Sequence, residues 1–94
     1  MDKKKLRYAI LKEIDKGNTP LTEFDFEVEE REFNEAVWFL MREGYLIGVY
    51  NADNKPHIDK IGPRLTEKGE TFLEENSTWS KLYKGLKEIK DWIK

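Results

Sequence analysis

The fold is decided by residues 29–62, which read EEREFNEAVWFLMREGYLIGVYNADNKPHIDKIG. Apolar side chains recur at helical spacing over the first half of this stretch, so residues 29–43 are predicted to form an amphipathic helix. Gly44 is expected to end it. The apolar face of this helix comprises Phe33, Ala36, Val37, Leu40 and Met41.

The second half of the stretch predicts a β-hairpin. Residues 45–50 are rich in β-branched and aromatic side chains, which is typical of a strand. The short polar residues at 51–56 favour a turn. Residues 57–61 are then predicted to return as the second strand, with Ile58 buried and Ile61 a second candidate for burial.

The segment before this stretch predicts one helix and one shorter element. Leu6, Ile10 and Ile14 form an apolar stripe, so residues 3–16 are predicted to be helical. Residues 21–28 are ambiguous, because their aromatic residues alternate as in a strand while their start resembles the start of a helix. We interpret them as a short helical turn.

The segment after the hairpin predicts two more helices. The first covers residues 67–75 and contains Gly69, which costs about 1 kcal/mol relative to alanine in a helix. A close approach of another backbone segment would explain this glycine. The second covers residues 79–92 and has the most regular apolar stripe in the chain: Trp79, Leu82, Leu86, Ile89 and Ile93.

The order of these elements is helix, short helical turn, helix, hairpin, helix and helix. A helical pair followed by a hairpin is the arrangement of a winged helix, a variant of the helix-turn-helix. We therefore predict an α+β fold of winged-helix type, as a single domain over residues 1–94.

Composition narrows the class of protein further. The chain has no cysteine, which excludes disulfides and thiolate metal sites, and 38% of its residues are charged. No apolar run approaches the roughly 20 residues needed to span a bilayer. No apolar segment follows the basic start, as it would in a secretory signal. We expect a soluble, cytoplasmic protein that does not enter a membrane.

Charge is unevenly distributed along the chain, although the net charge is only −2. Residues 22–35 hold seven acidic residues and one arginine, whereas residues 1–16 and 81–94 hold six and five basic residues. If the two ends are adjacent, they form a basic patch remote from the acidic helix. This patch would contact nucleic acid or an acidic protein. The alternative is a solubilising surface near helix C-termini, where cations are favoured.

Six segments of the chain read LRYAILKEI (6–14), GNTPL (17–21), REGY (42–45), LTEKGE (65–70), WSK (79–81) and KEIKDWIK (87–94). Together they resemble the YjcQ-like family, short proteins of bacteria and their phages or prophages, over nearly the whole chain. The resemblance implies a winged-helix-like α+β fold and a prophage-related setting, and it assigns no mechanism. The segment at 65–69 is also similar to the start of the helix after the wing in several winged-helix repressor families.

The helix at 29–43 would be the recognition helix, which enters the DNA major groove. Arginine and asparagine side chains suit base edges and phosphates, so its polar face is a candidate nucleic-acid-binding surface. The acidic residues of its first half oppose this, because carboxylates repel phosphates. The alternative is a solvated helix face. The candidate residues are Arg31, Asn34, Trp38 and Arg42.

Two further sets of residues are candidates for binding. The hairpin would be the wing, and its basic residues Lys55, Lys60 and Arg64 are candidates for phosphate contacts. Trp38 and Trp92 fall outside the main apolar stripes of their helices, so each is a candidate anchor for a protein interface. The alternative is that a neighbouring element partly covers each ring.

No pattern in the sequence indicates catalysis. The chain has one histidine, His57, and lacks a Gly-rich phosphate loop, an HExxH motif and the ligand spacing of a calcium loop. We expect no enzyme activity, no cofactor, no metal site and no small-molecule substrate.

Two functions are compatible with these observations. The first is a DNA-binding transcriptional regulator of phage or prophage type, dimeric through its C-terminal helix. The second is a protein-interaction or phage-structural module that uses the winged-helix scaffold without binding DNA. Fold alone does not decide between them.

Overall fold

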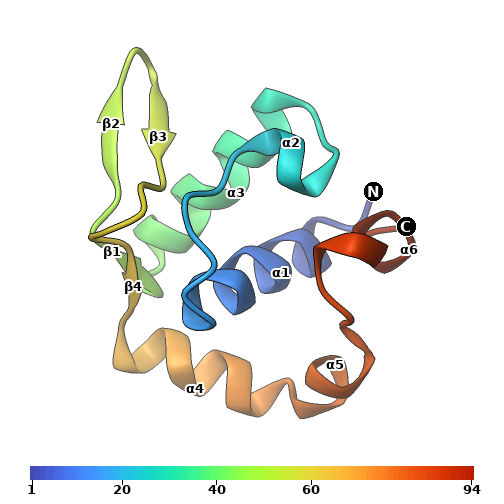
Figure 1. Ribbon diagram of the computed structural model, residues 1–94. Coiled ribbons are helices and arrows are strands. Elements are labelled where there is room, and N and C mark those ends of the chain that lie inside the picture. Colours follow the sequence, from blue (N-terminus) through green and yellow to red (C-terminus); the bar gives the residue numbers. More distant parts are fainter.

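Helix α1, Lys3–Asp15, lies in the middle of the computed structural model, which describes all of residues 1–94 (Figure 1). The Asp2 carboxylate begins the helix by accepting hydrogen bonds from two backbone N–H groups of the first turn. Seven of the 13 residues are buried, among them Tyr8 and the acidic Glu13. The helix predicted at 3–16 is confirmed, and it is buried on more than one side.

Two helices follow, α2 at Glu23–Phe26 and α3 at Glu30–Arg42. At the start of α3, the Glu32 carboxylate accepts a hydrogen bond of 3.0 Å from the backbone N–H of Glu29. This bond satisfies one of the N–H groups that a helix leaves free at its start. The short helical turn and the longer helix predicted here are both confirmed.

One long hairpin, residues 46–65, contains four short strands: β1 at Leu46–Ile47, β2 at Tyr50–Ala52, β3 at Lys55–His57 and β4 at Arg64–Leu65. β1 pairs with β4 and β2 pairs with β3, and both pairs are antiparallel (Figure 1). Leu21, in the loop after α1, forms an isolated bridge to Ile58. This bridge connects the hairpin to the helical part of the chain.

The hairpin differs from its prediction in three ways, the first being that its returning strand, β3, covers residues 55–57 and not 57–61. Its first strand is interrupted at Gly48, where φ is +84° and where a Cβ would overlap the carbonyl of Gly62. The two backbones therefore touch where the strand pairs separate. The turn predicted at 51–56 is too long, because only Asp53 and Asn54 lie outside the ladder. Both have positive φ, a conformation that short polar residues tolerate in two-residue turns.

Helix α4, Glu67–Glu75, confirms the helix predicted after the hairpin. The Thr66 side chain accepts a hydrogen bond of 3.0 Å from the N–H of Gly69, and the Thr66 N–H donates to the Tyr45 carbonyl at 3.1 Å. This brings the Tyr45 backbone so close that a Cβ on Gly69 would overlap it. The close approach expected at Gly69 is confirmed.

The single helix predicted at 79–92 is wrong. The C-terminal segment forms α5 at Ser77–Leu82, a 3₁₀ turn η1 at Leu86–Glu88 and α6 at Ile89–Trp92. Tyr83 is extended and Gly85 has φ +95°, so the chain bends between α5 and η1 and passes around α1 (Figure 1). A straight helix over residues 79–92 would be about 20 Å long, so it could not have placed residues from both of its ends against the single ring of Tyr8.

An aromatic cluster holds this segment to α1. The fully buried ring of Tyr8 lies at its centre, and the ring centroids of Trp79, Tyr83 and Trp92 are 5.6, 6.1 and 5.7 Å away. Aromatic pairs at such separations stabilise a fold beyond the area they bury. The Trp92 indole N–H also donates to the carbonyl of Lys5 at 2.8 Å.

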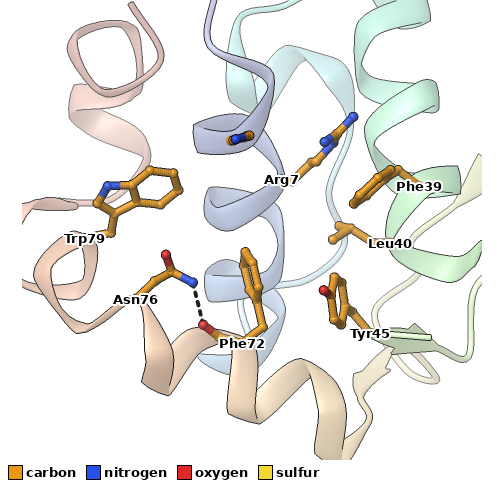
Figure 2. A pocket seen from close by; sticks show the side chains of 8 residues that line it. Arg7, Phe39, Leu40, Tyr45, Phe72, Asn76 and Trp79 are labelled. Atoms are coloured by element: carbon orange, nitrogen blue, oxygen red, sulfur yellow. Dashed lines mark hydrogen bonds between the residues drawn. The ribbon is translucent and has the colours of Figure 1, made fainter. Parts of the chain in front are cut away.

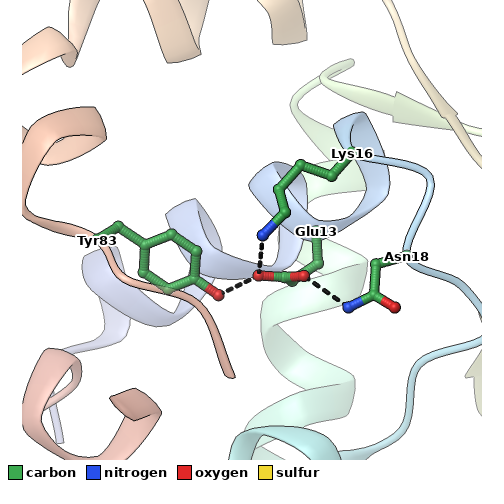
Figure 3. A network of polar contacts seen from close by, with 4 residues as sticks. All are labelled: Glu13, Lys16, Asn18 and Tyr83. Carbon is green, nitrogen blue, oxygen red and sulfur yellow. Dashed lines mark hydrogen bonds and ion pairs between the residues drawn. The ribbon is translucent and has the colours of Figure 1, made fainter. Parts of the chain in front are cut away.

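The Glu13 carboxylate is buried in α1 and has three partners (Figure 3). The Tyr83 hydroxyl donates to it at 2.5 Å, the Asn18 amide donates at 2.7 Å, and the Lys16 ammonium lies at 3.4 Å. Burial and the Glu13 carboxylate both raise the pKa of Tyr83, so its hydroxyl remains a proton donor. Through this network Tyr83, the extended residue that follows α5, is held against α1.

The two ends of the chain meet, because the N–H of Asp2 donates to the carbonyl of Ile93 at 2.6 Å. The 19 buried apolar residues form one contiguous cluster. Helices combined with two small antiparallel sheets confirm the α+β class. Among the helices, none has the length and apolar character required to cross a membrane.

We expect Tyr83→Phe to lower the free energy of unfolding by about 1.5–3 kcal/mol, as for other hydrogen bonds to a charged group. Urea unfolding of both proteins measures this. Because the pKa of Tyr83 is raised in the folded protein, its contribution is complete below about pH 10 and is lost as the pH rises further. The difference between the proteins should therefore shrink at alkaline pH. Equal stability at neutral pH would contradict the prediction.

We expect Gly69→Ala to destabilise the protein, although alanine is the better helix former by about 1 kcal/mol. The overlap is with a backbone carbonyl that cannot rotate away, and overpacking typically costs about 1–3 kcal/mol. Thr71→Ala, at an exposed position of the same helix, is the control and should not destabilise. A thermal midpoint for Gly69→Ala at or above that of the parent would disprove the overlap.

Candidate functional site

The exposed face of α3 is the surface that the sequence indicates for nucleic acid. Arg31 lies on it, but its Nε is 3.2 Å from the Glu35 carboxylate, and both side chains are largely exposed. Arg42 forms no ion pair, and its guanidinium lies 5.8 Å from the ring centre of Phe39. One of the two arginines of this face is therefore already paired with a carboxylate.

Asn34 does not lie on this exposed face, and its expected position is wrong. Its exposed fraction is 8%. It sits at the edge of the apolar stripe, where α3 packs against β3, and lines a hollow together with Leu21 and Pro56. Because the residue is buried, its amide is not available on the exposed face of α3.

Trp38 joins α3 to the hairpin. Its indole N–H donates to the side-chain oxygen of Asn51 in β2 at 2.7 Å. The ring is half-buried, which agrees with partial cover by a neighbouring element. Its only hydrogen-bond donor is thus used inside the molecule.

The basic residues of the hairpin are accessible. Lys60 and Arg64 are exposed, Lys55 is half-buried, and none of the three forms an ion pair. The tip of the hairpin adds one acidic residue, Asp53. These three cations keep their charge available for a partner.

The hairpin also exposes three large apolar side chains that the sequence reasoning did not select. Ile47, Tyr50 and Ile61 are 41%, 51% and 88% exposed. The burial considered for Ile61 is wrong, whereas Ile58 is buried as predicted. Alternation along β1, with Leu46 inside and Ile47 outside, is the signal that could have identified Ile47. Ile61 gave no such signal, because it lies outside the strands, where alternation does not apply.

Tyr50 is held in place on the hairpin surface. Its ring stacks on that of His57, with centroids 5.0 Å apart and planes 9° apart. The Asp59 carboxylate beside it raises the pKa of its hydroxyl. The His57 ring is itself fixed by a hydrogen bond of 3.1 Å between Nε2 and the Ala52 carbonyl.

Trp92 is buried, so the interpretation of this residue as an exposed interface anchor is wrong, and the alternative, cover by a neighbouring element, is correct. The prediction placed it on a continuous helix from residue 79. The bend at Gly85 instead turns α6 toward α1, and the indole packs against Tyr8 and Trp79.

The basic ends are adjacent, but they are not remote from the acidic helix. Lys3 and Arg7 of α1 line one groove with Glu32 and Glu35 of α3. In addition, three lysines outside this groove pair with carboxylates within 3.4 Å. These pairs are Lys16 with Glu13, Lys90 with Glu27 and Lys94 with Asp91. The expected basic patch is therefore interleaved with acidic side chains.

A pocket of about 310 Å³ lies between α1, the end of α3 and the α4–α5 segment (Figure 2). Its aromatic walls are Phe39, Tyr45, Phe72 and Trp79. Lys4 and Arg7 of α1 also line it, whereas no acidic residue does. The sequence reasoning missed this pocket because each residue, taken alone, fits a core position or a solvated helix face.

The structure contains no group of three or more histidine, aspartate or glutamate side chains arranged to hold a metal ion. The absence of enzyme activity and of a cofactor stays a prediction from the sequence.

Comparisons with known proteins agree on one family. The family model described as YjcQ protein matches residues 4–92. The "Uncharacterized protein YjcQ" of Bacillus subtilis (strain 168) is 66% identical over 94 residues, which are all of both chains. The solution NMR structure of the YjcQ protein from Bacillus subtilis is similar with a TM-score of 0.73 and 64% identity, covering 80% of this chain and 96% of that one. The chain belongs to the YjcQ family.

Proposed function

We propose that this chain is a non-enzymatic winged-helix module that binds a protein partner through its hairpin. The observation that carries the proposal is the exposure of Ile47, Tyr50 and Ile61 on that one hairpin. The cytoplasmic location and the prophage-related setting stay predictions from the sequence and the resemblance.

The order of elements supports the winged-helix part of the proposal. α1, α2 and α3 precede the hairpin, and the Leu21 bridge adds a strand residue between α1 and α2. In this arrangement α3 corresponds to the recognition helix and residues 46–65 to the wing. The indole N–H of Trp38 then fixes the wing relative to α3.

The surface of the wing supports a protein partner. Exposed apolar side chains gathered on one element favour contact with another protein surface, and a large aromatic ring often anchors such an interface. The stack on His57 holds the Tyr50 ring in one orientation, which reduces the conformational entropy lost on binding. On α3, the charges of Arg31 and Glu35 largely cancel because the two side chains form an ion pair.

Duplex DNA is the second candidate partner, favoured by one specific observation. Arg42, Lys55, Lys60 and Arg64 form no ion pair. Four unpaired cations on α3 and the wing would contact phosphates, which position a protein on DNA without reading its sequence. The burial of Asn34 removes the residue best suited to an adenine edge.

A photocrosslinking experiment tests the wing. The chain has no cysteine, so a cysteine introduced by Ile61→Cys would carry a photocrosslinker at one site only. Phe24→Cys, at a position of α2 that is 81% exposed, is the matched control. We expect the purified, labelled chain to capture another protein from a cell lysate when the probe is at position 61, and not when it is at position 24.

The captured protein, once purified, should bind the parent chain about thirtyfold or more tightly than Tyr50→Ala, since removing an interface anchor costs about 2 kcal/mol or more. Equal capture from both positions, or no capture from position 61, would contradict the proposal. A product of twice the mass of the chain would identify the partner as a second copy.

Gel retardation tests the DNA candidate directly. We expect no retardation of duplex DNA at micromolar protein in low salt, because the carboxylates of α3 and of the residue before it, Glu29, Glu30, Glu32 and Glu35, repel phosphates. Retardation that weakens steeply with salt, and that Lys60→Gln combined with Arg64→Gln abolishes, would favour DNA over a protein partner.

A further inference from the structure

The pocket between α1, α3 and the α4–α5 segment is a separate feature from the wing. It shares no residue with the three exposed apolar side chains of the hairpin, and it is closed on one side by the helix that carries Arg7 (Figure 2). Its volume of about 310 Å³ lies at the lower end of the range for small-molecule sites. That size suits a ligand of one or two rings.

The walls of the pocket select planar, aromatic ligands. Five of its eight lining residues are hydrophobic, and four of those carry aromatic rings. The rings of Tyr45 and Phe72 stack with centroids 5.0 Å apart, which fixes one wall. Trp79 forms the opposite side and is held by its edge-on contact with Tyr8. Fixed aromatic surfaces favour a flat ligand over a flexible chain.

The charge of the pocket selects an anion. Arg7 lies with its guanidinium carbon 3.6 Å from the ring centre of Phe39, and its Nε has no hydrogen-bond partner. Neither Arg7 nor Lys4 forms an ion pair. Glu32 and Glu35 line the groove on the other side of Arg7, and neither lies within ion-pair distance of it. A carboxylate is the group that a stacked guanidinium binds best.

The remaining polar side chain of the pocket, Asn76, can orient the ring of a bound ligand. The Asn76 side-chain amide donates to the Phe72 carbonyl at 2.8 Å, which fixes the side chain and leaves its oxygen free to accept (Figure 2). An acceptor at this position suits a ligand whose ring carries a hydroxyl or an N–H group.

We propose that this pocket binds a small aromatic carboxylate, with the carboxylate at Arg7 and Lys4 and a ring hydroxyl or N–H at Asn76. Binding of this ligand does not depend on the wing or on its partner.

Titration with 4-hydroxyphenylacetate and with indole-3-acetate, followed by NMR of the ¹⁵N-labelled protein, tests the site. We expect saturable shifts of the Trp79 indole and Asn76 side-chain amide signals at millimolar ligand or below. The neutral amides of both compounds are the chemical controls, and we expect them to bind at least about tenfold more weakly, because a hydrogen bond between charged groups is lost.

Three variants locate the anion. Lys4→Gln, at an exposed position, and Arg7→Gln should each weaken binding by roughly tenfold. Lys12→Gln, on the same helix but outside the pocket, should leave the affinity unchanged. The dispersion of each spectrum shows whether the variant is folded, so that Lys4→Gln still tests the site if Arg7→Gln is not. The proposal is overturned if the amides bind equally well, if Lys4→Gln and Lys12→Gln behave alike, or if no shift appears at millimolar ligand.

Discussion

α1 buries seven of its 13 residues, and α3, β4 and α4 all pack against it. Within it, the ring of Tyr8 contacts aromatic rings of α4, α5 and α6. A chain of this length can form only one core, and buried aromatic rings dominate the energy of a small core. The helical segments that follow the hairpin therefore pack back onto α1. The C-terminal segment does so by forming three short elements, α5, η1 and α6, in place of one continuous helix. The pocket lies between α1, α3 and the α4–α5 segment.

The sequence was sufficient to predict the elements that local signals specify. The stripe and the start of α1, the periodicity of α3 and the bounds of α4 are properties of neighbouring residues. The C-terminal segment was mispredicted because Trp79, Leu86 and Ile89 have helical spacing whether they lie on one helix or on three short turns. The contact that decides between the two is the hydrogen bond of Tyr83 to Glu13, which joins residues 70 positions apart and leaves no trace in local spacing.

The candidate surfaces were predictable only in part, for a similar reason. A helical wheel separates the apolar face of α3 from its polar face, but it cannot show that the hairpin covers Asn34 and holds Trp38. Charge counts found the acidic helix and the basic ends, yet the distances between them depend on the packing of α1 against α3. The aromatic pocket combines residues of α1, α3, α4 and α5 with Tyr45 and Asn76, so no local pattern in the sequence reveals it.

The backbone hydrogen bond between Asp2 and Ile93 holds the two ends of the chain next to each other. A domain whose ends meet can be inserted whole into a surface loop of a host protein, since the host chain enters and leaves at one place. The same closure permits circular permutation, in which the old ends are joined and new ends are opened elsewhere. The exposed pair Asp53 and Asn54, at the tip of the hairpin, is a suitable place for the new ends. The two arms of the hairpin would then become the two terminal segments of the permuted chain.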